Sequence, residues 1–419
     1  MDRLLLLWAL NASSLQCTTH GPSASGVAII SAWDIKNAFP SMWQDGVDHI
    51  IWPWTKGVRG KIWRICRNME RNLSGKVRIN GHYIQLGKYM RGGNQGAVSM
   101  PHRWKYLVAP FMEMLVDNGA YTQIAGTPVP GFAFVDDFSL FSPDLSILAL
   151  QLNARAKFAT MYGVDWAPAK DQYLIRGTAA AKNFTDAEFE VLTGSAALKN
   201  IKILGEIIGK DPSRCKLQVT KTLKGVAAAA GSIEWLRWKG TAATPAVVLH
   251  LFQALVQSVA CSHLVLSDTL DSELDTLDAV KTSLGRRLLG VSPLTSKWAV
   301  LGELGWFPFR SAVLLARLLF LGRLFRREEG SLLATLLEVR LAQLDATNAP
   351  KSFLASLRGI MMDLGLSSYW SCRPFPTKGS WKRLCKAAIR DSDIKQWEAW
   401  RDTSGPDNGF LNLTKHSGP

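Results

Sequence analysis

Short apolar runs separated by turn residues characterise the first half of the chain. The β-branched run over residues 27–33 predicts a buried strand, and Asp34 follows at its end. Residues 76–84 alternate around an Asn-Gly pair, which is typical of a tight hairpin. Residues 132–141 hold two aspartates between apolar flanks, so we expect a second hairpin with carboxylates at its tip.

Apolar residues at helical spacing predict three helices in the same half of the chain. They are expected over residues 61–71, 101–118 and 145–162, and short strands over 171–176 and 202–208. Beyond Gly209 the pattern becomes leucine-rich and helical, with few strand signals. We therefore predict an α+β chain with a domain boundary near Gly209 and a poorly ordered polar tail after Leu344.

The formal net charge of +15 favours a polyanionic partner, either nucleic acid or an anionic membrane face. A basic globular protein without such a partner is the alternative. The 6 cysteines include no Cys-x-x-Cys pair and no Cys/His cluster with zinc spacing. This usage indicates free thiols in a reducing compartment.

Two apolar segments bear on targeting and membrane insertion. The run from Leu4 to Leu10 is short for a signal peptide and follows an acidic residue. The most apolar region, residues 311–325, is interrupted by Arg317 and Arg323. We therefore expect an intracellular, soluble protein with no membrane partner.

Three carboxylates are the candidates for chemistry. Asp34 ends the first buried strand, and Asp136 and Asp137 lie in the turn of the later hairpin. Three carboxylates brought together repel one another unless a divalent cation neutralises them, and hard oxygen ligands suit magnesium. Two such ions roughly 3.5–4 Å apart can clamp the attacking and leaving oxygens of a phosphoryl transfer. Taken singly, the Asp-Asp pair could be a solvated turn, and Asp34 could cap a helix that starts at Ile35.

The order of five short segments is more informative than any one of them. Residues 34–39, Asp-Ile-Lys-Asn-Ala-Phe, resemble motif A of reverse transcriptases. Residues 91–96, Arg-Gly-Gly-Asn-Gln-Gly, resemble motif B, and Phe-Val-Asp-Asp at 134–137 resembles motif C. Residues 164–170 lie where motif D places its lysine, and residues 204–209 resemble the Leu-Gly turn of motif E.

A downstream element narrows this resemblance to the non-LTR (LINE-type) retrotransposons. Residues 301–308, Leu-Gly-Glu-Leu-Gly-Trp-Phe-Pro, are similar to an element that follows the polymerase in that group. The resemblance covers roughly residues 25 to 345. It implies a right-hand polymerase palm, an antiparallel sheet packed on helices, followed by an all-α thumb. The implied divisions are an N-terminal remnant (1–26), palm with partial fingers (27–209), helical thumb and post-thumb (210–345) and polar tail (346–419).

The resemblance implies a role for each site residue. Asp34, Asp136 and Asp137 would bind two magnesium ions. Ile35 and Phe39 would contact the nucleotide, with the Phe39 ring excluding a ribose 2′-hydroxyl. The further implied residues are Gln95 and Gly96 at the template–nucleotide pair, Lys170 at the leaving pyrophosphate, Leu204 and Gly205 in the primer grip, and Lys210, Arg214, Lys216, Lys221 and Lys224 along the primer–template backbone.

Each of these roles has a plainer alternative. Phe39 could be an ordinary core aromatic, and Gln95 and Gly96 could belong to a simple Gly-rich loop. Lys170 could be a surface lysine, and the basic stretch a solvated face.

The implied activity is RNA-directed DNA polymerisation, with an RNA template, a DNA primer and deoxynucleoside triphosphates as partners. No obligate protein partner is evident, and the family suggests the nucleus. The motifs depart from the family at Met100, where serine is usual, and at Pro40. Only about thirty residues precede Asp34, so the fingers are largely missing and we expect binding without robust polymerisation. A non-catalytic nucleic-acid-binding relic and a group II intron maturase-like protein are the alternatives.

Overall fold

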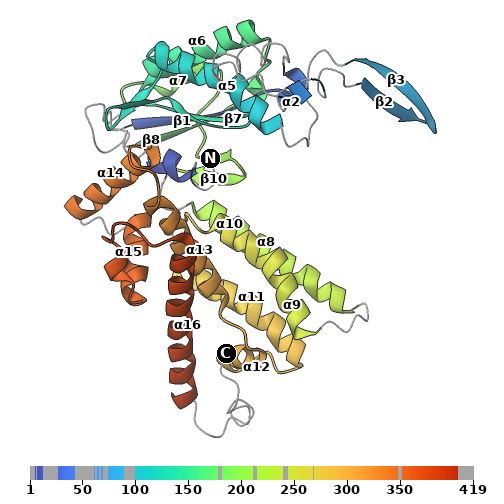
Figure 1. The fold of residues 1–419 in the computed structure, drawn as a ribbon, viewed down its shortest axis with the longest axis vertical. Helices are drawn as coiled ribbons and strands as arrows, with labels where there is room; N and C mark the ends of the chain where they lie inside the picture. The colour runs from blue at the N-terminus through green and yellow to red at the C-terminus, as the bar shows by residue number, and fades with distance from the viewer. Residues whose placement is uncertain are drawn as a thin grey trace. The chain divides into compact units, whose positions relative to one another are not determined.

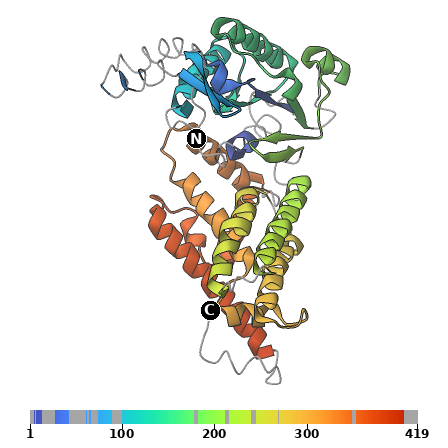
Figure 2. The same cartoon turned by 90° about the vertical axis from the view of Figure 1, so that its right-hand side faces the viewer.

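The fold combines helices with small antiparallel sheets in two compact units, Met1–Lys210 and Asp211–Pro419 (Figure 1; Figure 2). It is described from a computed structural model of the chain. The described residues are 5, 7–12, 27–42, 61, 64, 65, 68, 74–88, 100–177, 182–210, 215–238, 244–267, 269–347 and 352–403.

A four-stranded antiparallel sheet organises unit 1. Its strands are β1 (Val27–Asp34), β6 (Gly131–Phe134), β7 (Asp137–Ser142) and β8 (Gln172–Gly177), in the order β6-β7-β1-β8. β1 lies inside the sheet and pairs with β7 and β8. Its near-continuous burial explains why this segment is a run of apolar residues rather than an alternating one. The strand and the hairpin expected around the aspartates are therefore confirmed.

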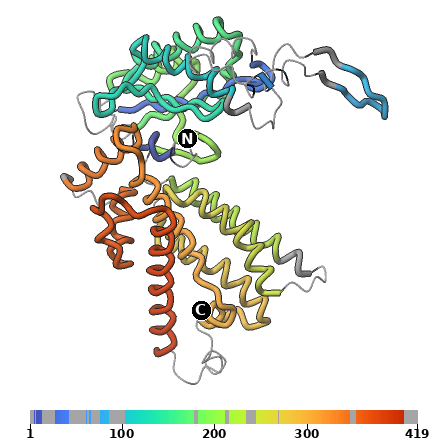
Figure 3. The backbone as a smooth tube through the Cα atoms, viewed as in Figure 1, coloured from blue at the N-terminus to red at the C-terminus, as the bar shows by residue number. Residues whose placement is uncertain are grey.

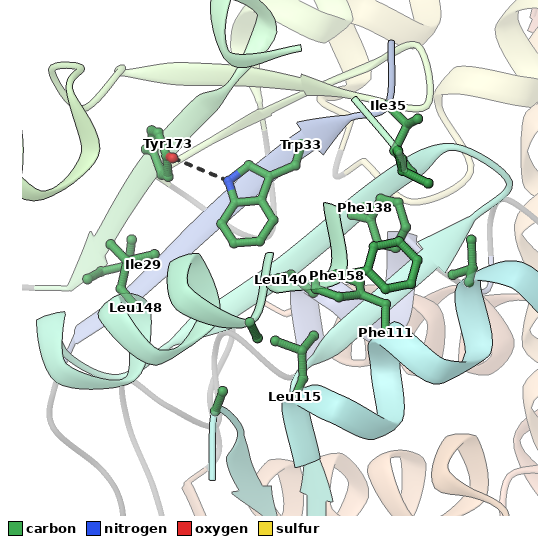
Figure 4. Packing of buried hydrophobic residues seen from close by; sticks show 14 of the residues in the cluster. Ile29, Trp33, Ile35, Phe111, Leu115, Phe138, Leu140, Leu148, Phe158 and Tyr173 are labelled. Carbon is green, nitrogen blue, oxygen red and sulfur yellow. Dashed lines mark hydrogen bonds between the residues drawn. The ribbon is translucent and has the colours of Figure 1, made fainter. Parts of the chain in front are cut away.

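Three helices pack with this sheet in unit 1. They are α5 (Met100–Asp117), α6 (Leu145–Tyr162) and α7 (Asp186–Thr193). Asp144 caps α6 by accepting a hydrogen bond from the Ile147 amide, and left-handed Gly163 ends the helix. Phe111, Phe138 and Phe158 meet between the helices and the sheet (Figure 4), with ring centroids 5.1–5.3 Å from Phe111. These aromatic contacts fix the sheet on which the aspartates lie.

Smaller elements complete the described part of unit 1. They are α2 (Ala38–Ser41), the 3-10 turn η1 (Pro168–Lys170) and three hairpins: β2 (Ser74–Ile79) with β3 (His82–Lys88), β4 (Thr122–Ile124) with β5 (Thr127–Val129), and β9 (Asn200–Ile203) with β10 (Glu206–Gly209). The hairpin predicted around Asn80-Gly81 is confirmed, with both turn residues at positive φ. Of the helix expected over 61–71, only positions 61, 64, 65 and 68 are described, and all four are helical.

Unit 2 is helical in its described residues (Figure 3). Its helices are α8 (Lys216–Trp238), α9 (Pro245–Leu251), the π-helix η3 (Phe252–Gln257), α10 (Ser258–His263), α11 (Asp271–Leu289), α12 (Lys297–Leu304), α13 (Phe309–Phe325), α14 (Leu332–Thr347), α15 (Phe353–Asp363), the 3-10 turn η4 (Ser367–Tyr369) and α16 (Lys378–Thr403).

The polar tail expected over residues 346–419 differs from the structure, because α15 and α16 lie within it. The polar composition of this region obscured the helical pattern of its apolar residues. One side of α16 is buried, and it includes Trp381, Cys385, Ile389 and Trp397. The Trp381 indole N–H donates to the Leu318 carbonyl of α13 at 2.7 Å. This contact docks α16 on the rest of unit 2.

One described stretch bears on the expectation of no membrane-spanning segment, which stays a prediction. In the described part of the chain, the stretch Pro245–His263 is long and apolar enough to cross a membrane. The pair α12 and α13, bent by 73°, passes the same test together. Val248, Phe252, Val256 and Ala260 of the first stretch are buried in the core of unit 2. A core helix can meet the same criteria of length and composition, so this finding decides nothing about location.

Candidate active site

The pairing of β1 with β7 brings the candidate carboxylates together. In this antiparallel register Asp34 is the Cα partner of Asp137, and Asp136 immediately precedes Asp137 in the turn. Val135, the other turn residue, has a φ of 58°, which a β-branched residue rarely adopts. The Trp104 indole N–H donates to the Val135 carbonyl at 2.6 Å. That hydrogen bond from α5 holds the turn that presents the two aspartates.

The electrostatics of the site reflect an excess of negative charge. Burial, then the Asp136 and Asp34 charges, raise the pKa of Asp137 from 3.8 to about 6. Burial also raises the pKa of Asp136, a backbone hydrogen bond opposes this rise, and the charge of Asp34 adds to it. Asp136 and Asp137 are therefore harder to ionise, first because they are partly buried and then because other carboxylates lie near them.

Lys170 supplies a compensating charge. Its Nζ lies 2.5 Å from Oδ2 of Asp34, and this hydrogen bond is the main reason that the pKa of Lys170 is raised. Two backbone hydrogen bonds connect the segment that carries Lys170 to the end of β1. The Lys36 amide donates to Asp165 at 2.8 Å, and the Ala167 amide donates to Asp34 at 3.0 Å. The sequence-predicted lysine is thus beside the predicted carboxylates.

The three carboxylates match a hard divalent cation in donor chemistry. Asp34, Asp136 and Asp137 offer only oxygen donors, and their mutual repulsion is what a cation would relieve. With the side chains as they stand, no group of three or more His, Cys, Asp or Glu among the described residues is arranged to hold a metal ion. The backbone placement and the donor type therefore fit magnesium, whereas the present side-chain arrangement pairs Asp34 with Lys170 instead.

Ile35 and Phe39 follow directly after β1. Ile35 is buried and bridges to Trp166, so its side chain belongs to the core. Phe39 is half-buried on α2, and its ring meets Trp104 edge-on with centroids 5.8 Å apart. Phe39 is therefore only partly enclosed by the core, and its role as a sugar gate stays a prediction.

The expected nucleic-acid contacts are only partly described. Leu204 and Gly205 form the β9–β10 turn, both at positive φ, and Lys210 is exposed directly after β10. On α8 of unit 2 the exposed residues include Lys216, Lys221 and Lys224. The remaining expected contacts, Gln95, Gly96 and Arg214, lie outside the described residues.

Sequence reasoning missed a buried ion pair that involves Asp171, the residue after Lys170. Arg155 and Asp171 form a buried ion pair, and the Arg155 guanidinium lies over the Trp33 and Trp166 rings. A signal was present in the sequence: Arg155 takes a position on the buried stripe of α6, where an apolar residue is normal. A charged residue on that stripe requires a partner, which the spacing alone does not name.

Comparisons with known proteins add little to this geometry. No protein-family model matches the chain, and no curated protein matches it. A solved structure of telomerase from Candida albicans, in complex with a TWJ fragment of telomeric RNA, is similar with a TM-score of 0.34 and 13% identity. The match covers 75% of this chain and 56% of the telomerase chain, so this chain spans just over half of that protein's length. Similarity at this level establishes neither fold nor function.

Proposed function

We propose that this chain is a reverse-transcriptase-like nucleotidyltransferase of the LINE type, which extends a DNA primer on an RNA template. The observation that carries the proposal is the β1–β7 register, which pairs Asp34 with Asp137 and places Asp136 beside them. The order of the five motif-like segments gives independent support. Three acidic residues where the two inner strands of the sheet end, with a lysine at hydrogen-bond distance from Asp34, suit phosphoryl transfer.

In the proposed reaction the primer 3′-hydroxyl attacks the α-phosphate of a deoxynucleoside triphosphate. Asp34, Asp136 and Asp137 would hold two magnesium ions. When bound, these ions would activate the hydroxyl and stabilise the leaving pyrophosphate. Lys170 would protonate or neutralise the pyrophosphate, because its ammonium group already lies at the carboxylate edge. Phe39 would fill the space that a 2′-hydroxyl needs.

The second candidate is a nucleic-acid-binding protein without turnover. The net charge of +15 favours it, since charge supports binding to phosphate backbones and requires no catalytic group. The exposed lysines of α8, Lys216, Lys221 and Lys224, would serve either function.

Primer extension separates the two candidates. We expect the purified chain to add deoxynucleotides to a DNA primer on an RNA template slowly, and only with Mg²⁺. Asp136→Asn should lower the rate by at least about 100-fold, because losing metal-mediated charge stabilisation costs several kcal/mol. Asp117→Asn, at an exposed aspartate that ends α5, is the matched control and should keep the wild-type rate.

A binding titration at two salt concentrations completes the test. Salt-dependent binding without extension by the wild-type chain would support the second candidate and contradict the first. The low rate of extension that the sequence suggests stays a prediction, which the same assay measures.

A further inference from the structure

Arg155 contacts two tryptophan rings that meet edge-on. It projects from α6, and its guanidinium carbon lies 4.9 Å from the Trp33 ring centroid and 4.8 Å from the Trp166 ring centroid. A guanidinium can stack on aromatic faces because it is planar and weakly hydrated. Arg155 therefore connects β1, which carries Trp33, with the segment after α6, which carries Trp166.

The same guanidinium is paired with Asp171. Nη1 forms a close ion pair with Oδ2, and Nη2 donates to Oδ1 at 3.3 Å. The two side chains are 9% and 6% exposed, so both charges are almost fully removed from water. A forked, two-bond contact fixes the orientation of both partners, and a lysine cannot reproduce it.

Two residues that Arg155 contacts are neighbours, in the sequence, of Lys170 and Asp34. Trp33 immediately precedes Asp34, and Asp171 immediately follows Lys170. The Trp166 indole N–H also donates to the Arg155 carbonyl at 3.1 Å, which fixes the start of the Lys170 segment. One side chain thus touches the residues that set the backbone positions of both members of the pair.

We propose that Arg155 is a positioning residue for Lys170. By holding Asp171 and the two tryptophans, it fixes the backbone from Trp166 to Asp171 so that the lysine amine reaches the carboxylate edge. The catalytic consequence rests on the proposed function, since Lys170 acts there on the leaving pyrophosphate. The placement of Lys170 at Asp34 does not rest on it and can be measured without turnover.

Zero-length carbodiimide coupling measures that placement directly. The reagent joins an amine to a carboxylate in contact with it, and the product is an amide that mass spectrometry identifies. In the full-length protein without metal we expect a Lys170–Asp34 crosslink. The ion pair between Lys182 and Asp186 is an internal control, because neither residue is among the Arg155 partners described above, which are Asp171, Trp33 and Trp166.

Arg155→Lys is the informative variant, because it keeps the charge but loses the forked pairing with Asp171 and the planar group that contacts both rings. We expect the Lys170–Asp34 crosslink to fall by about five-fold while the Lys182–Asp186 crosslink is unchanged. Arg78→Lys, the same change at an exposed arginine of β2, should leave both crosslinks at wild-type yield. An unchanged Lys170–Asp34 yield in Arg155→Lys would overturn the proposal. A fall of both crosslinks together would also contradict it, because that pattern shows general loosening of unit 1.

Primer extension tests the catalytic consequence separately. Arg155→Lys and Lys170→Met should each lower kcat with little change in the KM for nucleotide, and the double variant should be no slower than Lys170→Met. Independent, additive losses would refute action through Lys170. If the wild-type chain shows no extension, the proposed function fails while the crosslinking result still decides the placement of Lys170.

Discussion

Asp137→Asn should stabilise unit 1, because the native carboxylate carries a penalty that a neutral amide of the same shape avoids. The pKa of Asp137 rises from 3.8 to about 6, which corresponds to about 3 kcal/mol if the whole shift acts on stability. The residue as a whole is exposed, although its carboxylate is partly desolvated, so solvent screens much of this energy. We therefore expect a gain of about 1 kcal/mol at pH 8, or about 2–4 °C in Tm for a unit of this size.

The pH dependence of this gain identifies its cause. Because the folded pKa of an acid is raised, the native state binds more protons than the unfolded state between pH 3.8 and about 6. The wild-type free energy of unfolding therefore falls as the pH rises through that window. The advantage of Asp137→Asn should be absent at pH 4 and complete at pH 8.

Thermal unfolding of wild type and variant at both pH values is the assay. Mg²⁺ should stabilise the wild type by mass action and stabilise Asp137→Asn less, since one ligand is lost. An equal gain at pH 4 and pH 8 would refute the electrostatic explanation. A loss of stability at pH 8 would show that the carboxylate makes contacts worth more than its repulsion.

Three further outcomes are expected. Phe39→Val should reduce discrimination against ribonucleotides, measured as the ratio of kcat/KM values in primer extension, and unchanged discrimination would leave Phe39 as a core aromatic. Gly131→Ala should destabilise unit 1 by about 1–3 kcal/mol in urea unfolding, because the new Cβ would lie 2.4 Å from the Ser139 carbonyl oxygen. The control is Gly359→Ala in α15, where a new Cβ would meet no atom within 4 Å, and this variant should be neutral or stabilising. Burial raises the pKa of Asp393 from 3.8 to about 6, so the wild-type free energy of unfolding should fall as the pH rises between these values. Asp393→Asn should remove up to about 3 kcal/mol of this fall, measured by urea unfolding at several pH values.

Local patterns in the sequence predicted the central elements of unit 1. The strand before Asp34 is a continuous apolar run because side chains on both faces of β1 are buried. The strands on either side of the Asp-Asp turn also carry buried residues. The proximity of Asp34 to Asp137, by contrast, cannot be predicted from local patterns. It depends on a pairing between segments about a hundred residues apart, and only the motif order suggested that pairing.

Two features escaped sequence reasoning for physical reasons. In α16 the buried stripe is formed largely by tryptophan and cysteine among many charged residues, so average polarity suggested a tail. Arg155 lies on the buried stripe of α6, and that position alone does not identify its partners. Its burial depends on Asp171, Trp33 and Trp166 arriving from other elements, which no local pattern specifies.

Divalent-metal binding tests the central claim most directly, because it requires neither primer nor template. Electron paramagnetic resonance of Mn²⁺, used in place of Mg²⁺, counts free ions during a titration of the purified chain. We expect saturable binding that weakens by at least about tenfold in Asp136→Asn and in Asp34→Asn, since each removes a charged oxygen ligand. Asp117→Asn should bind as the wild type does. Wild-type affinity in both carboxylate variants would contradict the assignment of Asp34, Asp136 and Asp137 as the metal-binding site.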